Sequence, residues 1–228
     1  GSINNIKEIA EITQKHNIML HVDAVQCVGK IPIDLNEIKI DMMSLSAHKF
    51  YGPKGVGALF IRKGVNLKTI INGGGQELNL RPGTENIAGI AGLGLAITMA
   101  YDNIEDNIKY IKKLEQLFID ELNNYKINYT LHIEDRLPGV LAIGFPNIDG
   151  QSLLISLDLK GVAVSFGSAC SSGATKASPI LLDAGINEDL AKSTLRISFG
   201  KIHTKDDVKY VAEQLSISLK RLDKKIDV

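Results

Sequence analysis

Residues 44–57 read SLSAHKFYGPKGVG and place a lysine, Lys49, between an apolar segment and a loop rich in glycine. Two polar residues, Ser46 and His48, stand close before it. The glycines indicate a loop that needs positive φ angles or a close approach of the backbone. A solvated loop lysine is the ordinary interpretation of such a residue. A lysine that forms a Schiff base with a carbonyl compound is the alternative.

The composition is that of an ordinary globular protein. The chain has 228 residues, of which 44% are hydrophobic, and its 26 basic and 26 acidic residues give a formal charge of zero. This size allows one or two domains. No basic run interleaves with aromatic residues, so we expect no nucleic-acid partner. The longest apolar stretch, 87–101, is too short and too rich in glycine for a membrane span, so we expect no membrane association.

Strands and helices alternate in the first hundred residues. We predict a helix over 3–16 and strands over 17–24, 41–47 and 57–63. This alternation predicts an α/β class with a largely parallel sheet and helices on both faces. Residues 81–125 are predicted to be helical for most of their length, with an apolar first half and an amphipathic second half.

The rest of the chain predicts a smaller α+β domain. We expect two antiparallel strands around the Pro-Gly turn within 131–147, strands over 162–166 and 193–200, and helices over 150–161, 178–185 and 204–222. Thr204 is the predicted cap of the last helix. The change in character near residue 104 divides the chain into domains 1–103 and 104–228.

Several polar residues are predicted at one sheet edge. Asp23 ends an apolar run, and ligands bind at the carboxyl edge of open α/β sheets. A capping aspartate is the commoner explanation, and Gln26 is placed to share a pocket with Asp23. Lys49 follows the next strand, with Ser46 and His48 as donors for a phosphate. An amine for an aldehyde, a carboxylate for a pyridinium nitrogen and donors for a phosphate together describe pyridoxal phosphate.

Three further residues have open interpretations. Thr84, in RPGTEN, is the predicted N-cap of a long helix, and such a helix start also suits a phosphate. Cys170, in the small-residue loop FGSACSSGA, is a structural thiol, a metal ligand or a nucleophile. The five histidines show no metal-ligand spacing. Arg196, in TLRISFG, is an exposed strand charge or a bidentate clamp for a carboxylate.

Cys27 and Cys170 are the only cysteines. We read Cys27 as a small buried apolar residue. Without a CxxC motif, two cysteines fit a reducing compartment better than a disulfide framework, so we predict a cytoplasmic protein.

Five motifs occur in order: HVDAVQ (21–26), SLSAHKFYGPKGVGALF (44–60), RPGTEN (81–86), VSFGSACSSG (164–173) and TLRISFG (194–200). Together they resemble the cysteine desulfurases, pyridoxal-phosphate enzymes within the class V aminotransferases. The resemblance implies an aspartate aminotransferase-like fold (fold type I), with part of the large cofactor-binding domain followed by a small α+β domain. The SACSSG loop resembles the branch with a longer catalytic loop, which serves general or nitrogenase iron–sulfur assembly.

Carried over residue by residue, the resemblance implies specific roles around the cofactor. Lys49 would hold the cofactor as a Schiff base and carry a proton at the substrate carbon. Asp23 would pair with the pyridine nitrogen, and Gln26 would bond the phenolic oxygen of the ring. Ser46 and His48 would bind the phosphate.

The resemblance also implies a substrate and partners. Thr84 would reach the phosphate of the neighbouring subunit's cofactor, which makes the enzyme a homodimer. Arg196 would hold the carboxylate of L-cysteine. Cys170 would take the sulfur, release L-alanine and pass a persulfide to an iron–sulfur scaffold protein. A transient role as an iron–sulfur ligand is the one metal-related expectation, and it also falls on Cys170.

The family pattern begins well before residue 1 of this chain. The preceding part is expected to carry a phosphate-binding turn, a histidine stacked on the ring and an asparagine near the cofactor. We therefore expect the 228 residues to hold an incomplete cofactor pocket. The alternatives are a selenocysteine lyase, another class V pyridoxal-phosphate enzyme, or an inactive truncated fragment of the desulfurase.

Overall fold

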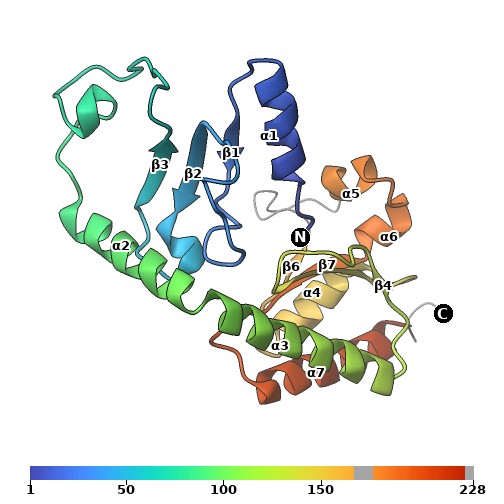
Figure 1. The fold of residues 1–228 in the computed structure, drawn as a ribbon. Helices are drawn as coiled ribbons and strands as arrows, with labels where there is room; N and C mark the ends of the chain where they lie inside the picture. The colour runs from blue at the N-terminus through green and yellow to red at the C-terminus, as the bar shows by residue number, and fades with distance from the viewer. Residues whose placement is uncertain (167–176, 224–228) are drawn as a thin grey trace. The chain divides into compact units, whose positions relative to one another are not determined.

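The computed structural model describes residues 1–166 and 177–223 (Figure 1). The chain divides into two compact units. The first unit is Asn4–Asp106, and the second unit is Asn107–Val228 together with Gly1–Ile3. The break after Asp106 lies close to the boundary that we expected after residue 103. The first three residues differ from that expectation, because they pack with the second unit.

The first unit contains a three-stranded sheet in the order β1-β2-β3. Its elements are α1 (Ile6–Lys15), β1 (His21–Asp23), β2 (Met42–Ser46), the 3-10 helices η1 (Ala47–Phe50) and η2 (Glu77–Asn79), β3 (Gly57–Ile61) and α2 (Ile87–Asp102). β1 and β2 are parallel, as predicted. β3 is antiparallel to β2, so the prediction of a largely parallel sheet is wrong for this strand. Residues 47–56 form too short a connection for the crossover that a parallel pair requires.

Apolar and polar side chains alternate along β1 and most of β2, so the first sheet has an apolar face and a polar face. On one face, Met43 is buried in the core cluster of the unit, and Val22 and Leu45 pack against that cluster. α1 and α2 also contribute apolar side chains to it. The residues that alternate with these share the opposite face, since successive side chains of a strand point to opposite sides. We call this the polar face of the sheet; its residues on β1 and at the end of β2 are His21, Asp23, Ser44 and Ser46.

The second unit contains a four-stranded antiparallel sheet in the order β4-β5-β7-β6. Its strands are β4 (Thr130–Leu131), β5 (Val140–Gly144), β6 (Ser165–Phe166) and β7 (Thr194–Ser198). The helices are α3 (which begins at Ile104 and ends at Asn124), α4 (Gly150–Asp158), α5 (Pro179–Asp183), α6 (Glu188–Lys192) and α7 (Lys205–Asp223).

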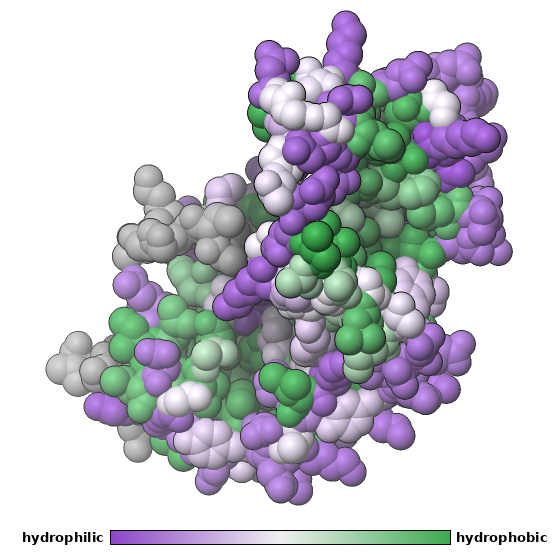
Figure 2. All heavy atoms as spheres, turned by 90° about the vertical axis from the view of Figure 1, so that its left-hand side faces the viewer, coloured by the Kyte–Doolittle hydropathy of each residue, from purple (hydrophilic) through white to green (hydrophobic). Residues whose placement is uncertain are grey.

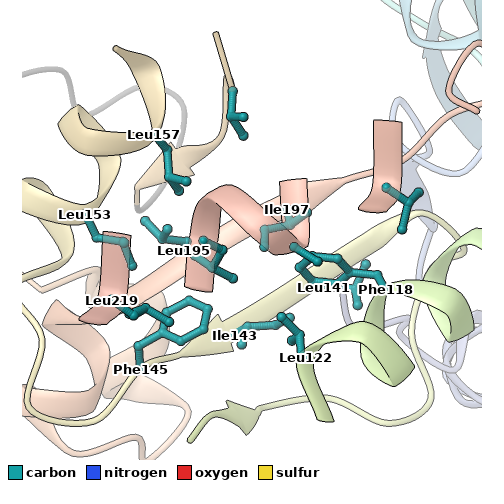
Figure 3. Packing of buried hydrophobic residues seen from close by; sticks show 14 of the residues in the cluster. Phe118, Leu122, Leu141, Ile143, Phe145, Leu153, Leu157, Leu195, Ile197 and Leu219 are labelled. Carbon is teal, nitrogen blue, oxygen red and sulfur yellow. The ribbon is translucent and has the colours of Figure 1, made fainter. Parts of the chain in front are cut away.

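One face of this second sheet forms the larger core. Leu141, Ile143 and Leu195 are fully buried there. Figure 3 shows them packed against apolar side chains of α3, α4 and α7. Because fully burying one such side chain stabilises a fold by about 1.5 to 3 kcal/mol, this cluster provides most of the stability of the unit.

The first residues of the chain extend this second unit. The amide of Leu137 donates to the carbonyl of Gly1 at 2.7 Å, and Ser2 forms an antiparallel bridge with Arg136. The second unit therefore combines the start of the chain with residues that follow α3.

The predicted long helix over 81–125 is two helices, since α2 ends at Asp102 and α3 starts at Ile104. Among the described residues, no single helix is long and apolar enough to cross a membrane. The pair α2 and α3 meets the length and composition criteria only when joined across Asn103.

Candidate active site

The carboxyl ends of β1 and β2 bring several predicted residues to one edge of the first sheet. Asp23 is the last residue of β1, and Ser46 is the last residue of β2. The two strands are parallel, with Asp23 opposite Ser44, so both ends point the same way. Asp23 is exposed, and its Oδ1 accepts a hydrogen bond from the amide of Val25 at 3.0 Å. This bond fixes one carboxylate oxygen and leaves the other for a ligand.

Lys49 lies in the 3-10 helix η1, which follows Ser46 without an intervening residue. Ala47 and Phe50 are buried and anchor this turn in the core, whereas Lys49 is half-buried. The turn closes tightly, since the amide of Gly52 donates to the carbonyl of Ala47 at 2.8 Å. A Cβ atom at Gly52 would lie 2.9 Å from the Cβ of Ala47, so only glycine fits there.

Ser46 and His48 form a hydroxyl–imidazole pair beside Lys49. The Oγ of Ser46 lies 2.9 Å from Nδ1 of His48. His48 is exposed, and its other ring nitrogen, Nε2, takes no part in this bond. Whichever group donates within the pair, the other keeps one donor for an anion at the end of β2.

Gln26 and Cys27 lie in the turn after β1. Gln26 is exposed, and its Oε1 accepts from Nζ of Lys30 at 3.3 Å. Cys27 is half-buried, rather than fully buried as we expected. Burial raises the pKa of the Cys27 thiol, and the charge of Asp23 raises it further, although Lys30 opposes the shift. Cys27 is therefore held as a thiol and is a poor nucleophile.

Thr84 is exposed in the segment before α2, and the predicted N-cap role is wrong. α2 starts at Ile87, and its cap is Asn86, whose Oδ1 accepts from the amide of Gly89 at 3.0 Å. Asparagine caps as well as threonine does, and it stands directly before the helix.

Arg196 is the central residue of β7, between Ala142 on β5 and Ser165 on β6. Its neighbours Leu195 and Ile197 are buried on the core face, so Arg196 lies on the opposite face. The side chain is half-buried, and its guanidinium has no hydrogen bond or ion pair with the rest of the described chain. A guanidinium can form a bidentate pair with a carboxylate.

The predicted nucleophile, Cys170, falls outside the described residues, as does most of the loop around it. The structure thus describes seven of the eight predicted site residues. Five of them lie at or just after the carboxyl ends of β1 and β2 in the first unit: Asp23, Gln26, Ser46, His48 and Lys49. Within the described residues, no group of three or more His, Cys, Asp or Glu side chains is arranged to hold a metal ion.

These residues suit pyridoxal phosphate by their chemistry. A carboxylate at Asp23 matches a protonated pyridine nitrogen, and an amine at Lys49 matches an aldehyde. The Ser46–His48 pair keeps a donor for a phosphate at the same edge of the sheet. The donor set therefore fits this cofactor.

Sequence reasoning missed one neighbour of this site. On the polar face, Nε2 of His21 lies 2.8 Å from Oγ of Ser44. The motif HVDAVQ contains the histidine, but only the register of β1 against β2 brings it to Ser44.

A family model described as aminotransferase class-V matches residues 1–211. The chain belongs to the class V aminotransferase family. Members of this family depend on pyridoxal phosphate, which confirms the predicted cofactor at the level of the family.

Two curated relatives share the name cysteine desulfurase IscS. The protein of Dictyoglomus turgidum is 42% identical over 224 residues, which cover 97% of this chain and 57% of the relative. The protein of Methanosarcina thermophila is also 42% identical, and the match covers 93% of this chain and 53% of the relative. The chain thus spans little more than half the length of the curated relatives it matches.

Solved structures confirm the predicted fold. A NifS-like protein superimposes with a TM-score of 0.88 at 35% identity, covering 97% of this chain and 58% of that structure. A NifS-like protein from Rickettsia africae gives a TM-score of 0.87 at 36% identity, covering 96% and 59%. A structure described as SspA in complex with cysteine gives a TM-score of 0.71 at 31% identity. The match covers 90% of this chain and 56% of that structure. The fold is that of the fold type I, aspartate aminotransferase-like enzymes.

Proposed function

We propose that the whole protein is a cysteine desulfurase, which converts L-cysteine to L-alanine and retains the sulfur as a cysteine persulfide. One observation carries this proposal: a carboxylate, a hydroxyl–imidazole pair and a half-buried lysine lie at the carboxyl ends of two adjacent parallel strands. They do so in a chain 42% identical to proteins named cysteine desulfurase. The relative whose title names a complex with cysteine supports L-cysteine as the substrate.

The residues of the first unit would hold the cofactor. Bound pyridoxal phosphate supplies a ring that accepts an electron pair from the carbon beside the substrate carboxylate. The free oxygen of Asp23 would keep the ring nitrogen protonated, and Gln26 would bond the phenolic oxygen. Ser46 and His48 would hold the phosphate. Nζ of Lys49 would bind the aldehyde carbon and then carry a proton at the substrate carbon.

Two residues would act on L-cysteine itself. The guanidinium of Arg196 would hold the substrate carboxylate in a bidentate pair. The thiolate of Cys170 would attack the substrate sulfur, so that an S–S bond forms as the C–S bond breaks and the carbon takes up a proton. The products are L-alanine and a persulfide on Cys170. No added oxidant is required, because the sulfur is oxidised while the carbon that it leaves is reduced.

The two cysteines provide a matched test of this assignment. We would incubate the protein with pyridoxal phosphate, L-cysteine and a thiol reductant, and measure L-alanine and sulfide. Cys170→Ala should reduce the formation of L-alanine and of sulfide to the level that free pyridoxal phosphate gives without protein. The cofactor bound to this variant should keep its colour. Cys27→Ala should retain activity, because Cys27 is half-buried with a raised pKa. If L-alanine still forms in Cys170→Ala, the proposed mechanism is contradicted. If the protein converts selenocysteine but not L-cysteine, the alternative of a selenocysteine lyase is favoured.

Lys49 has its own matched control in Lys54, an exposed lysine of the same loop. Borohydride reduction should attach the cofactor covalently to the unsubstituted protein and to Lys54→Ala, but not to Lys49→Ala, as intact mass would show. A protein that stays colourless with added cofactor would instead favour the alternative of an inactive fragment.

We also propose a homodimer in which Thr84 reaches the phosphate of the neighbouring subunit's cofactor. Support comes from α2, which carries a single charged residue, Asp102, yet leaves Leu95 and Met99 more than half exposed. The preceding segment leaves Ile70 91% exposed. Figure 2 shows apolar, green patches on the side of the molecule that carries these segments. Helices that are apolar all round are normally buried, which favours a second copy as their cover.

Sedimentation should test the dimer. Leu95→Glu should shift the protein toward the monomer, while Ile155→Glu, an equally drastic change at an exposed residue of α4, should not. A monomeric unsubstituted protein would contradict the proposal.

The final acceptor of the sulfur is proposed to be an iron–sulfur scaffold protein, as the relatives' assignment to the IscS and NifS-like groups suggests. Two cysteines without a CxxC motif suit a reducing compartment, so we propose the cytoplasm as the location. Transfer of labelled persulfide sulfur from the protein to a purified scaffold would test the acceptor.

A further inference from the structure

The polar face of the first sheet carries a second hydroxyl–imidazole pair that the proposed mechanism does not use. Oγ of Ser44 lies 2.8 Å from Nε2 of His21, and Ser46 pairs with His48 in the same way two residues further along β2. The His21–Ser44 bond joins two strands, whereas the Ser46–His48 bond stays within one segment. Their roles should therefore differ.

The His21–Ser44 bond lies where the ladder between β1 and β2 ends. β1 has three residues, and its last one, Asp23, is the register partner of Ser44. Beyond that pair, the amide of Ala24 donates to the carbonyl of Ser44 at 3.0 Å. So short a strand has few backbone bonds to hold its end, and a side-chain bond on the polar face adds to them.

The position of the end of β1 sets the distance between Asp23 and Lys49, and the cofactor requires a particular value of this distance. Asp23 is carried by β1, while Lys49 and Ser46 follow from β2. One rigid ring would bind Asp23 through its nitrogen and Lys49 through its aldehyde carbon, so the two side chains must keep a fixed separation. Groups that bind a rigid ligand must be held within about 0.5 Å of the positions in which they bind it.

We infer that His21 is a positioning residue for the cofactor: acting through Ser44, it fixes the end of β1 so that Asp23 keeps its spacing from Lys49. This inference rests on the proposed function of the same site. It predicts that His21 affects cofactor affinity without touching the cofactor, and that the effect requires the hydroxyl of Ser44.

A double-mutant cycle tests the inference on the protein with pyridoxal phosphate as the probe. The variants are His21→Ala, Ser44→Ala and the double substitution, with His21→Gln as a variant that keeps a hydrogen-bonding group for Ser44. His16→Ala is the matched control, since His16 is an exposed histidine at the end of α1. The two readouts are the dissociation constant of the cofactor, from its visible absorption, and the thermal unfolding of the cofactor-free protein.

Each single alanine variant should weaken cofactor binding about three- to tenfold, the size expected for one net hydrogen bond. The double variant should be no weaker than either single one, His21→Gln should recover part of the affinity, and His16→Ala should bind like the unsubstituted protein. The inference is overturned if His21→Ala binds within twofold of the unsubstituted protein, if the single effects multiply, or if only the unfolding temperature changes. If the unsubstituted whole protein binds no cofactor, the proposed function itself is overturned, and this inference with it.

Discussion

The carboxylate of Glu115 ties α3 to the turn before β5, since it accepts from Nη2 of Arg136 at 3.1 Å and from the amide of Gly139. Glu115 is only 5% exposed. Removing it leaves the guanidinium of Arg136, whose side chain is 14% exposed, without its ionic partner and the buried amide of Gly139 without an acceptor. Glu115→Ala should therefore lower the free energy of unfolding by about 3 to 5 kcal/mol, measured in urea.

The matched control for Glu115 is Glu188, which pairs with Lys192 at 2.6 Å on the surface of α6. Glu188→Ala should change the free energy of unfolding far less, because water solvates both partners of an exposed pair. If Glu115→Ala and Glu188→Ala lower the free energy of unfolding equally, burial does not make the Glu115–Arg136 pair more important than the exposed pair.

His132 should make stability depend on pH. Thr194 donates its hydroxyl proton to the carbonyl of Leu190, so Nε2 of His132 donates to Thr194, 2.8 Å away. The remaining ring nitrogen, Nδ1, is buried and has no partner among the described residues. Burial lowers the pKa of His132 below its ordinary value of 6.5. Because the folded state then binds the proton less well than the unfolded state, stability is full above about pH 6.5 and falls as the pH drops below it.

Urea unfolding of the unsubstituted protein and of His132→Gln at pH 8 and pH 5.5 checks this pH effect. The glutamine variant should lose less stability between the two conditions, and the imidazole signals of His132 should titrate at a low pH in the folded protein. Parallel losses in both proteins would show that other groups carry the pH dependence.

Gly57 allows β3 to approach β2 beside the proposed phosphate site. It is the register partner of Ser46, and a Cβ atom there would lie 2.6 Å from the carbonyl oxygen of Leu45. Gly57→Ala should cost about 1 to 3 kcal/mol of stability and weaken cofactor binding, because β3 must move away from β2. Gly55 is the control: its φ is +79°, but nothing lies within 4 Å of an added Cβ atom. Gly55→Ala should lose about 1 kcal/mol through backbone strain and keep its cofactor affinity.

Asn86 and Thr84 separate the cap of α2 from the proposed phosphate contact. Asn86→Ala removes the side chain that accepts from Gly89, which should cost about 1 kcal/mol of stability. Thr84→Ala should change stability by less than about 0.5 kcal/mol, because Thr84 is exposed and outside the helix. Chemical unfolding of the two variants measures both effects. A larger stability loss in Thr84→Ala would restore the capping role that we first expected.

Local signals predicted much of the fold. The cap at Thr204 is confirmed, since its Oγ1 accepts from the amide of Asp207 and that carboxylate accepts from Thr204 in return. The antiparallel pair around the Pro-Gly turn is also confirmed, as β4 and β5. Both features depend on residues a few positions apart, which the sequence contains directly.

Features that depend on register or on competition between neighbours were not predictable. The direction of β3 is an exception, because residues 47–56 are too short a connection for the crossover of a parallel pair, and loop length alone indicates an antiparallel strand. Thr84 and Asn86 are both good caps, and the sequence alone does not choose between them. The bond between His21 and Ser44 joins residues that meet only once β1 and β2 have paired.

The bridge between Ser2 and Arg136 has a consequence for the order of events during translation. Domains generally fold as units while the ribosome releases the chain from its N-terminal end. The bridge cannot form until residue 136 has emerged, by which time every residue of Asn4–Asp106 is already outside. Ser2 therefore waits for a residue that is released much later, and Asn4–Asp106 has that whole interval in which to fold.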